Sequence, residues 1–131
     1  MQLLDTNIIS ELLRPRPNTG VLSWADQQDR FFISALSVEE SMYGLTRNRN
    51  PMLLEAYKTL LLTRCDVIPI TQDIACRAGT LRGQFSLHGT TRSQADMLIA
   101  ATAQQHNITL VTRNTRDFEG CGISLLNPFT N

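Results

Sequence analysis

SQADMLIAATAQQHNITLVT, residues 93–112, decides the fold class of this 131-residue chain. Its first part, 93–106, is apolar around nearly the whole circumference that a helix would present, and it begins with a serine suited to capping a helix. A helix with that pattern lies at the centre of a fold, with other elements packed against several of its sides. The last part, 108–112, is a short run of β-branched and aliphatic residues, which predicts a buried strand directly after the helix.

The same alternation of short apolar strands and helices continues outward along the chain. Strands are expected at 2–4, 31–35, 66–70 and 122–126, and helices at 6–14, 20–28, 37–47, 51–64 and 71–87. Helices that alternate with strands predict a parallel sheet covered on both faces. We therefore expect a single domain, residues 1–131, of the three-layer α/β/α class with a central parallel sheet of about 4–5 strands.

The composition is that of a globular protein without net charge. Hydrophobic residues make up 42% and charged residues 18%, and the formal net charge is zero. A neutral chain does not bind nucleic acid through an overall positive field, although it can carry a local basic rim. The three widely spaced cysteines fit neither a zinc nor a redox motif, so we expect small buried side chains. No apolar run reaches about 18 residues, and no signal-like region opens the chain, so we expect a soluble, cytoplasmic protein.

Four acidic residues follow predicted strands or begin predicted helices. Asp5 ends the first strand, and Asp117 comes a few residues after the strand at 108–112. Glu40 and Asp96 each lie in the first turn of a predicted helix. Because the carboxyl ends of parallel strands form the working crevice of such folds, we expect these carboxylates to face one another. Most other acids, Glu11 included, are expected at exposed positions.

Each of these acids also has a capping explanation. Ser37 opens the helix at 37–47, and with Glu40 it fits the capping box, in which an acid bonds back to the amide of the cap residue. Ser93 and Asp96 fit the same pattern, and Asp5 can cap the helix that follows it.

A bound divalent cation explains why the four acids occur together better than separate capping roles do. Four ionised carboxylates at one crevice repel one another, and no Arg or Lys lies in the motifs of Asp5, Glu40 or Asp96 to neutralise them. Oxygen ligands without clustered His or Cys suit Mg²⁺ or Mn²⁺ rather than zinc. Such an ion activates water for phosphodiester hydrolysis.

Four stretches together resemble the PIN-domain ribonucleases, and among them the VapC-type toxins of bacterial toxin–antitoxin pairs, including the FitB-like branch. They are LLDTNIIS (3–10), SVEESMYG (37–44), ADMLIAATAQQHNITLVTRNTRDF (95–118) and LNPF (126–129). The resemblance implies a PIN-like fold, a Mg²⁺ or Mn²⁺ site and an RNA substrate, often tRNA or ribosomal RNA. It also implies a VapB-type antitoxin, a homodimer and a toxin–antitoxin hetero-oligomer, with no membrane partner.

The family's metal-binding residues are carried over position by position. The Asp after the first strand, the Glu of the E-x-x-x-G turn and the Asp of the central helix match Asp5, Glu40 and Asp96. The family's fourth acid stands either directly after a T-R pair or three residues later, which are Asn114 and Asp117 here. We assign Asp117 to that position, with Asn114 as a helper that brings no charge.

Polar and basic residues around these acids are candidates to support the site. Thr6, Asn7 and Thr112 match supporting polar positions of the family. Arg113 and Arg116 flank the fourth acid and are the better placed candidates to hold RNA phosphates. Arg82 and Arg92 are weaker candidates for the same task, and an ordinary solvated surface is the alternative for all four arginines.

The resemblance and the acids together predict a metal-dependent endoribonuclease that arrests translation and growth. The alternative is a catalytically impaired PIN-like module that binds RNA or protein, which the amide at Asn114 favours and the retained acids oppose. A P-loop hydrolase is excluded, because the chain has no G-x-x-x-x-G-K segment. A receiver domain needs a lysine after a late strand, and Lys58, the only lysine, lies in a predicted helix.

Overall fold

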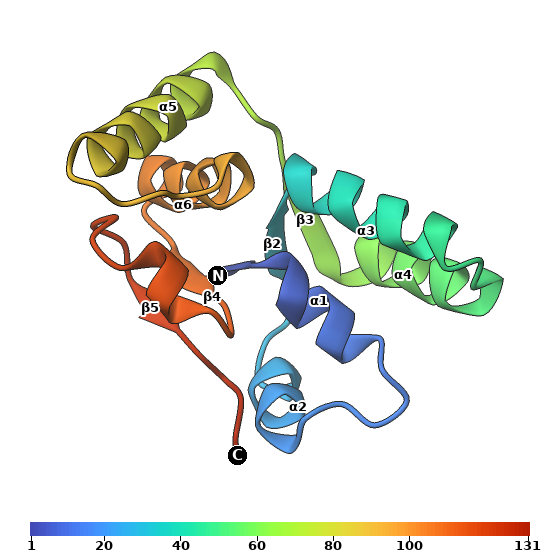
Figure 1. Cartoon of the computed structure of the whole chain (residues 1–131). Helices are drawn as coiled ribbons and strands as arrows, with labels where there is room; N and C mark the ends of the chain where they lie inside the picture. The colour runs from blue at the N-terminus through green and yellow to red at the C-terminus, as the bar shows by residue number, and fades with distance from the viewer.

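The computed structural model covers residues 1–131 and confirms the alternation of strands and helices. In chain order the elements are β1 (Gln2–Leu4), α1 (Thr6–Leu12), α2 (Thr19–Asp26), β2 (Phe31–Ser34), α3 (Ala35–Arg47), α4 (Pro51–Arg64), β3 (Cys65–Ile68), α5 (Gln72–Leu87), α6 (Gln94–His106), β4 (Thr109–Val111), the 3-10 turn η1 (Thr115–Phe118) and β5 (Leu125–Leu126). The five strands are all parallel, in the order β3-β2-β1-β4-β5. The predicted α/β/α class is therefore confirmed (Figure 1).

Each face of the sheet carries its own core, because successive residues of a strand point to opposite faces. Leu3 and Leu110 face α5 and α6 and join one buried cluster. Leu4 and Val111, their neighbours in sequence, join the second cluster with residues of α1, α2 and α4. Figure 1 shows α5 and α6 on one side of the strands and α1, α3 and α4 on the other. The first strand, β1, is central, so its carboxyl end lies in the middle of the sheet edge.

Helix α6 is the central helix that its apolar sequence predicts. It is buried at six positions, which are Met97, Ile99, Ala100, Ala101, Thr102 and Ala103. Figure 1 shows α6 with α5 on its outer side. Its residues Ala100, Ala101 and Ala103 join the buried cluster that also contains Ile74 and Ala78 of α5. The N-terminal turn of α6, which carries Asp96, therefore has a fixed position relative to the sheet.

The prediction that Ser37 begins α3 is wrong, because Ser34 is the N-cap of this helix. Ser34 pairs with Ile68 at the end of β2, and its Oγ then accepts a hydrogen bond from the amide of Leu36 at 3.1 Å. Two serines three residues apart both fit the cap pattern, and the one at the end of the strand begins the helix. Ser37 lies inside the first turns of α3 and is fully buried.

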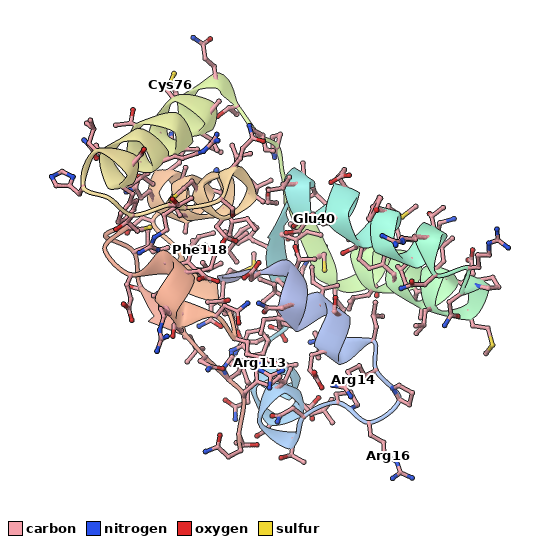
Figure 2. The ribbon with its side chains drawn as sticks, viewed as in Figure 1. Arg14, Arg16, Glu40, Cys76, Arg113 and Phe118 are labelled. Atoms are coloured by element: carbon pink, nitrogen blue, oxygen red, sulfur yellow. The ribbon has the colours of Figure 1, made fainter.

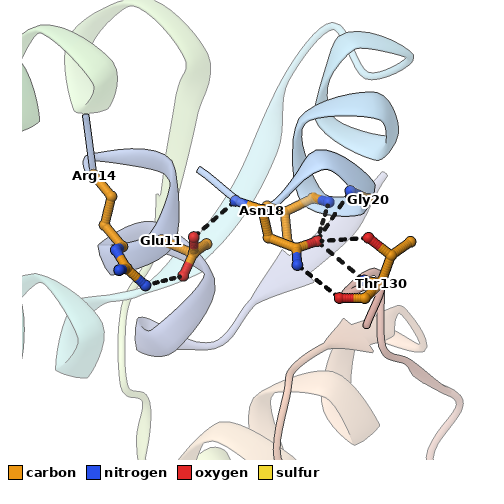
Figure 3. A network of polar contacts seen from close by, with 6 residues as sticks. Glu11, Arg14, Asn18, Gly20 and Thr130 are labelled. Atoms are coloured by element: carbon orange, nitrogen blue, oxygen red, sulfur yellow. Dashed lines mark hydrogen bonds and ion pairs between the residues drawn. The ribbon is translucent and has the colours of Figure 1, made fainter. Parts of the chain in front are cut away.

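The expectation of an exposed Glu11 is also wrong. Its side chain is buried because the segment after α1 folds back over it. Its carboxylate accepts a hydrogen bond from the Asn18 amide at 2.8 Å and from Arg14 at 3.2 Å. Asn18 caps α2, and its side chain forms two hydrogen bonds with the backbone of Thr130 (Figure 3). Its Oδ1 accepts from the Thr130 amide at 3.0 Å, and its Nδ2 donates to the Thr130 carbonyl at 2.7 Å. We call this contact of Thr130 with Asn18 the C-terminal clasp.

The cysteines follow the prediction only in part. All three are free thiols; Cys65 and Cys121 are buried, whereas Cys76 is exposed. Cys76 lies on α5, which is packed on one side only, and Figure 2 shows it at the edge of the molecule. None of the helices combines the length and the apolar sequence that crossing a membrane requires.

Candidate active site

Asp5 ends the central strand and is the most enclosed of the four predicted acids. Its side chain is 7% exposed. One carboxylate oxygen accepts a hydrogen bond from the Thr6 amide at 2.8 Å. The other accepts from the Thr112 hydroxyl at 2.8 Å and from the Asn7 side-chain amide at 3.2 Å. Two donors from the start of α1 and one from the loop after β4 therefore fix the orientation of this carboxylate.

Thr112 joins the ends of β1 and β4. It is fully buried, and its hydroxyl donates to Asp5 while accepting from the amide of Asn114 at 3.0 Å. In the same region the Asn7 side-chain oxygen accepts from the amide of Arg113 at 3.3 Å. Because β1 and β4 are parallel neighbours, both loops leave the same edge of the sheet, and these bonds hold them together.

Glu40 approaches this edge from the first turns of α3. Its Oε1 accepts a hydrogen bond from the Thr6 hydroxyl at 2.7 Å. Figure 2 labels Glu40 near the N-terminal end of α3. Glu39 is exposed on another face of the helix, beside Met42 and Tyr43. Glu40 rather than Glu39 is therefore connected to the loop that carries Asp5.

Asp96 and Asp117 stand on the other side of Asp5. The Ser93 Oγ caps α6 by accepting from the Asp96 amide at 3.0 Å, so the predicted cap at Ser93 is confirmed. Asp117 is exposed in η1, and its amide donates to the Asn114 carbonyl at 3.0 Å. The side chain of Asn114 makes no hydrogen bond within the chain, whereas its backbone shapes the turn that presents Asp117.

The pKa shifts connect the four acids pair by pair. Burial raises the pKa of Asp5, and the charges of Asp96 and Glu40 raise it further against the hydrogen bonds it accepts. Burial likewise raises the pKa of Asp96; the Asp117 charge adds to this, while Ser93 and Arg92 oppose it. Asp5 and Asp96 are thus each made harder to ionise by a neighbouring carboxylate, in addition to the effect of burial.

The donor set fits a hard divalent cation by its chemistry. None of the four acids belongs to an ion pair; the ion pairs of the chain join Glu11 with Arg14, Asp66 with Arg30 and Glu55 with Lys58. No three His, Cys, Asp or Glu side chains come close enough together to form a metal site as they stand. Anionic oxygens that repel one another and lack a paired cation are the ligands that Mg²⁺ and Mn²⁺ prefer.

Comparison with known proteins identifies the family. Residues 3–120 match the PIN domain. The chain belongs to the PIN-domain family. It is 34% identical to "Toxin FitB" of Neisseria gonorrhoeae, over 98% of this chain and 99% of that protein. It is 33% identical to "VapC ribonuclease Y4jK" of Sinorhizobium fredii, over 98% of both chains.

Solved structures agree with this PIN-domain assignment. The crystal structure of FitAcB from Neisseria gonorrhoeae matches with a TM-score of 0.85 and 33% identity, covering 98% of each chain. A toxin–antitoxin complex from Klebsiella pneumoniae matches with a TM-score of 0.78 and 29% identity, covering 100% of each chain.

Arg92 of this PIN domain has a role that its sequence position did not reveal. Its guanidinium donates to the carbonyl oxygens of Asp117 and, at 2.9 Å, of Glu119, and it lies 4.3 Å from the centre of the Phe85 ring. It therefore fixes the η1 turn to the end of α5. The signal was absent from the sequence because the two carbonyls lie 25 and 27 residues away.

The other arginines differ in how firmly they are held. The Arg113 guanidinium lies 4.6 Å from the centre of the Phe129 ring, and its carbonyl accepts from Asn127 at 3.4 Å. Arg116 is exposed and has no ion pair or hydrogen bond through its side chain. Arg82 is exposed and lines a small cavity of about 140 Å³ between α5 and α6. Arg113 and Arg116 thus stand on both sides of the Asn114 loop.

Proposed function

We propose that this chain is a metal-dependent endoribonuclease, the toxin of a toxin–antitoxin pair, whose RNA cleavage arrests translation and growth. The observation that carries the proposal is the environment of Asp5. This carboxylate is buried and fixed by three hydrogen bonds, its neighbours are further carboxylates, and no cation pairs with it. Membership of the PIN family and relatives named Toxin FitB and VapC ribonuclease support the same activity.

The residues that would hold Mg²⁺ or Mn²⁺ are Asp5, Glu40 and Asp96, with Asp117 completing the site. When bound, the ion supplies an activated water and neutralises charge on the leaving oxygen. Thr112 keeps Asp5 oriented, so the carboxylate does not have to reorganise when substrate arrives. The expected products carry 5′-phosphate and 3′-hydroxyl ends.

The substrate class that fits is a structured RNA, tRNA or ribosomal RNA, in the cytoplasm. The formal charge of the chain is zero, so RNA has to be held by local cations. Arg113 and Arg116 are free to meet phosphates on both sides of the cut, since neither forms an ion pair. Phosphate contacts of this kind set the register of the RNA, while base contacts set its sequence.

The partner that we propose is a VapB-type antitoxin, in a hetero-oligomer built on a toxin homodimer. The similarity to the toxin–antitoxin complex from Klebsiella pneumoniae, over the whole of both chains, supports this partner. Co-expression with the gene that neighbours the toxin gene, followed by gel filtration, tests the assembly directly.

The test of the activity uses purified, antitoxin-free protein and total bacterial RNA. New 5′ ends are mapped with Mg²⁺, with chelator, and with the variant Asp5→Asn. We expect a few discrete ends that need Mg²⁺ and disappear in Asp5→Asn. Asp26→Asn is the matched control, because Asp26 is an exposed acid at the end of α2 whose side chain forms no hydrogen bond or ion pair. It should leave cleavage unchanged.

The absence of new ends from the folded wild-type protein would contradict the proposal. It would favour a PIN-like module that binds RNA without cutting it, and Asn114, at a position where the family can carry an acid, would then be the residue to explain.

A further inference from the structure

Ser37 has a buried hydroxyl that its position in the helix does not explain. The residue is 0% exposed and lies inside α3, whose N-cap is Ser34. Its Oγ is 3.0 Å from the Oγ1 of Thr6, 31 residues earlier in the chain. A buried hydroxyl needs a partner, and this contact across two elements is the one it makes.

The Thr6 hydroxyl connects Ser37 to Glu40. Its Oγ1 lies within hydrogen-bond distance of Ser37 Oγ, at 3.0 Å, and of Glu40 Oε1, at 2.7 Å. A hydroxyl can donate one hydrogen bond and accept others, so Thr6 can contact both side chains at once. The result is a continuous chain of side-chain oxygens from Ser37 through Thr6 to Glu40.

This chain also reaches the acid on β1. The backbone amide of Thr6 donates to Asp5 Oδ1 at 2.8 Å, so Thr6 contacts carboxylates from two different elements. Ser37 and Glu40 are three residues apart on α3 and therefore face the same way. The contact with Ser37 fixes the position of the Thr6 hydroxyl, and that hydroxyl fixes the Glu40 oxygen relative to Asp5.

We infer that Ser37 is a positioning residue that, acting through Thr6, keeps Glu40 next to Asp5, where both carboxylates would take part in binding the divalent cation. The inference rests on the proposed function, because the role of Glu40 as a ligand belongs to it. Partners of metal ligands typically change metal affinity by 10–100-fold when they are removed. Since Ser37 acts through one intervening hydroxyl, the lower end of that range is expected.

The test is a calorimetric titration of Mn²⁺ into antitoxin-free protein, which measures binding without cleavage. Ser37→Ala should weaken Mn²⁺ binding about tenfold, and Thr6→Val at least as much. The double variant should bind no more weakly than Thr6→Val alone, because Ser37 has no route to Glu40 without Thr6. Thr6→Ser keeps the hydroxyl and should bind as wild type does.

Folding is monitored separately by melting each variant in chelator. Alanine is the best helix former, so Ser37→Ala should melt close to wild type. If it does not, Ser37→Cys replaces it, since a thiol has similar size and is a weaker donor. Ser86→Ala, which removes an exposed hydroxyl on α5, is the control for both measurements.

The outcomes separate the inference from the proposed function. Wild-type protein that takes up no Mn²⁺ would overturn both. Wild-type binding with equal affinity in Ser37→Ala would overturn the inference alone. Losses that add in the double variant would also overturn it, because they would mean that Ser37 acts by a route independent of Thr6.

Discussion

Asp5 and Asp96 are acids whose burial opposes their ionisation, and this predicts how the metal-free protein responds to pH. The pKa of each is raised above the ordinary value of 3.8. Between that value and the raised one, the folded protein holds protons that the unfolded chain has released. Stability contributed by these two groups is therefore present at low pH and is lost as pH rises through the folded pKa.

The measurement is the free energy of unfolding in chelator, for wild type and Asp5→Asn, from mildly acid to neutral pH. The stability of the variant relative to wild type should increase as pH rises, because the variant has no carboxyl at position 5 to ionise. Asp66 provides the contrast, since its pKa is lowered by the hydrogen bond from Arg30. The free energy of unfolding of Asp66→Asn should fall relative to wild type as pH rises through the acid range in which wild-type Asp66 ionises. A pH-independent difference for Asp5→Asn would contradict the prediction.

The contacts of Arg92 predict that its substitutions will have different effects from those of an arginine that binds phosphate. A lysine keeps the charge but lacks the planar fork that reaches two carbonyls and stacks on an aromatic ring. If Arg92 fixes η1, Arg92→Lys should lower the melting temperature and weaken cleavage about as much as Arg92→Gln. Arg116→Gln should leave the melting temperature unchanged and weaken RNA binding. Full activity in Arg92→Lys would favour a phosphate contact at Arg92 instead.

The acids of the site, and Thr6, Asn7 and Thr112 that hydrogen-bond to them, were predictable from the sequence, whereas the roles of Ser37 and Arg92 were not. Asp5, Glu40 and Asp96 follow strands or begin helices, and that position leaves a local pattern. Ser37 and Arg92 act through groups that are 25 or more residues away, so no spacing rule contains them. Their roles depend on which side chain meets which loop, and this is decided only when the layers pack.

At the scale of elements, the C-terminal clasp makes a prediction about Gly20. A Cβ on this residue would lie 2.4 Å from the Pro128 carbonyl oxygen and 2.9 Å from the Thr130 nitrogen, both backbone atoms (Figure 3 shows the region). Gly20→Ala should therefore lower the melting temperature, although alanine favours a helix by up to about 1 kcal/mol. In a chain ending at Leu126 the clash is absent, and the same substitution should be neutral or stabilising.

The element boundaries show which local signals are strong. The helix α4 begins at Pro51 and α5 is capped by Thr71, both as predicted, because Pro at a first position and a capping hydroxyl act locally. The last strand is shorter than predicted, Leu125–Leu126 rather than 122–126. Gly122 adopts φ of +69°, a turn conformation that delays the strand.

At the scale of the whole molecule, the parallel topology brings the site together. With β1 central and β2 and β4 beside it, the loop carrying Asp5 lies between the start of α3 and the loop after β4. Hydrophobic packing on both faces fixes these elements without regard to the charges at the edge. The fold therefore holds mutually repelling carboxylates near one another, and a bound cation should stabilise the entire domain.

This predicts that Mn²⁺ raises the melting temperature of wild type but not of Asp5→Asn. At a tenfold excess over the dissociation constant, binding to the folded state contributes about 1.4 kcal/mol, which corresponds to roughly 5 °C for a domain of this size. A monovalent salt at matched ionic strength is the control, because screening weakens repulsion without filling a site. An equal rise with that salt, or in Asp5→Asn, would mean that the acids only repel one another and do not bind the ion together.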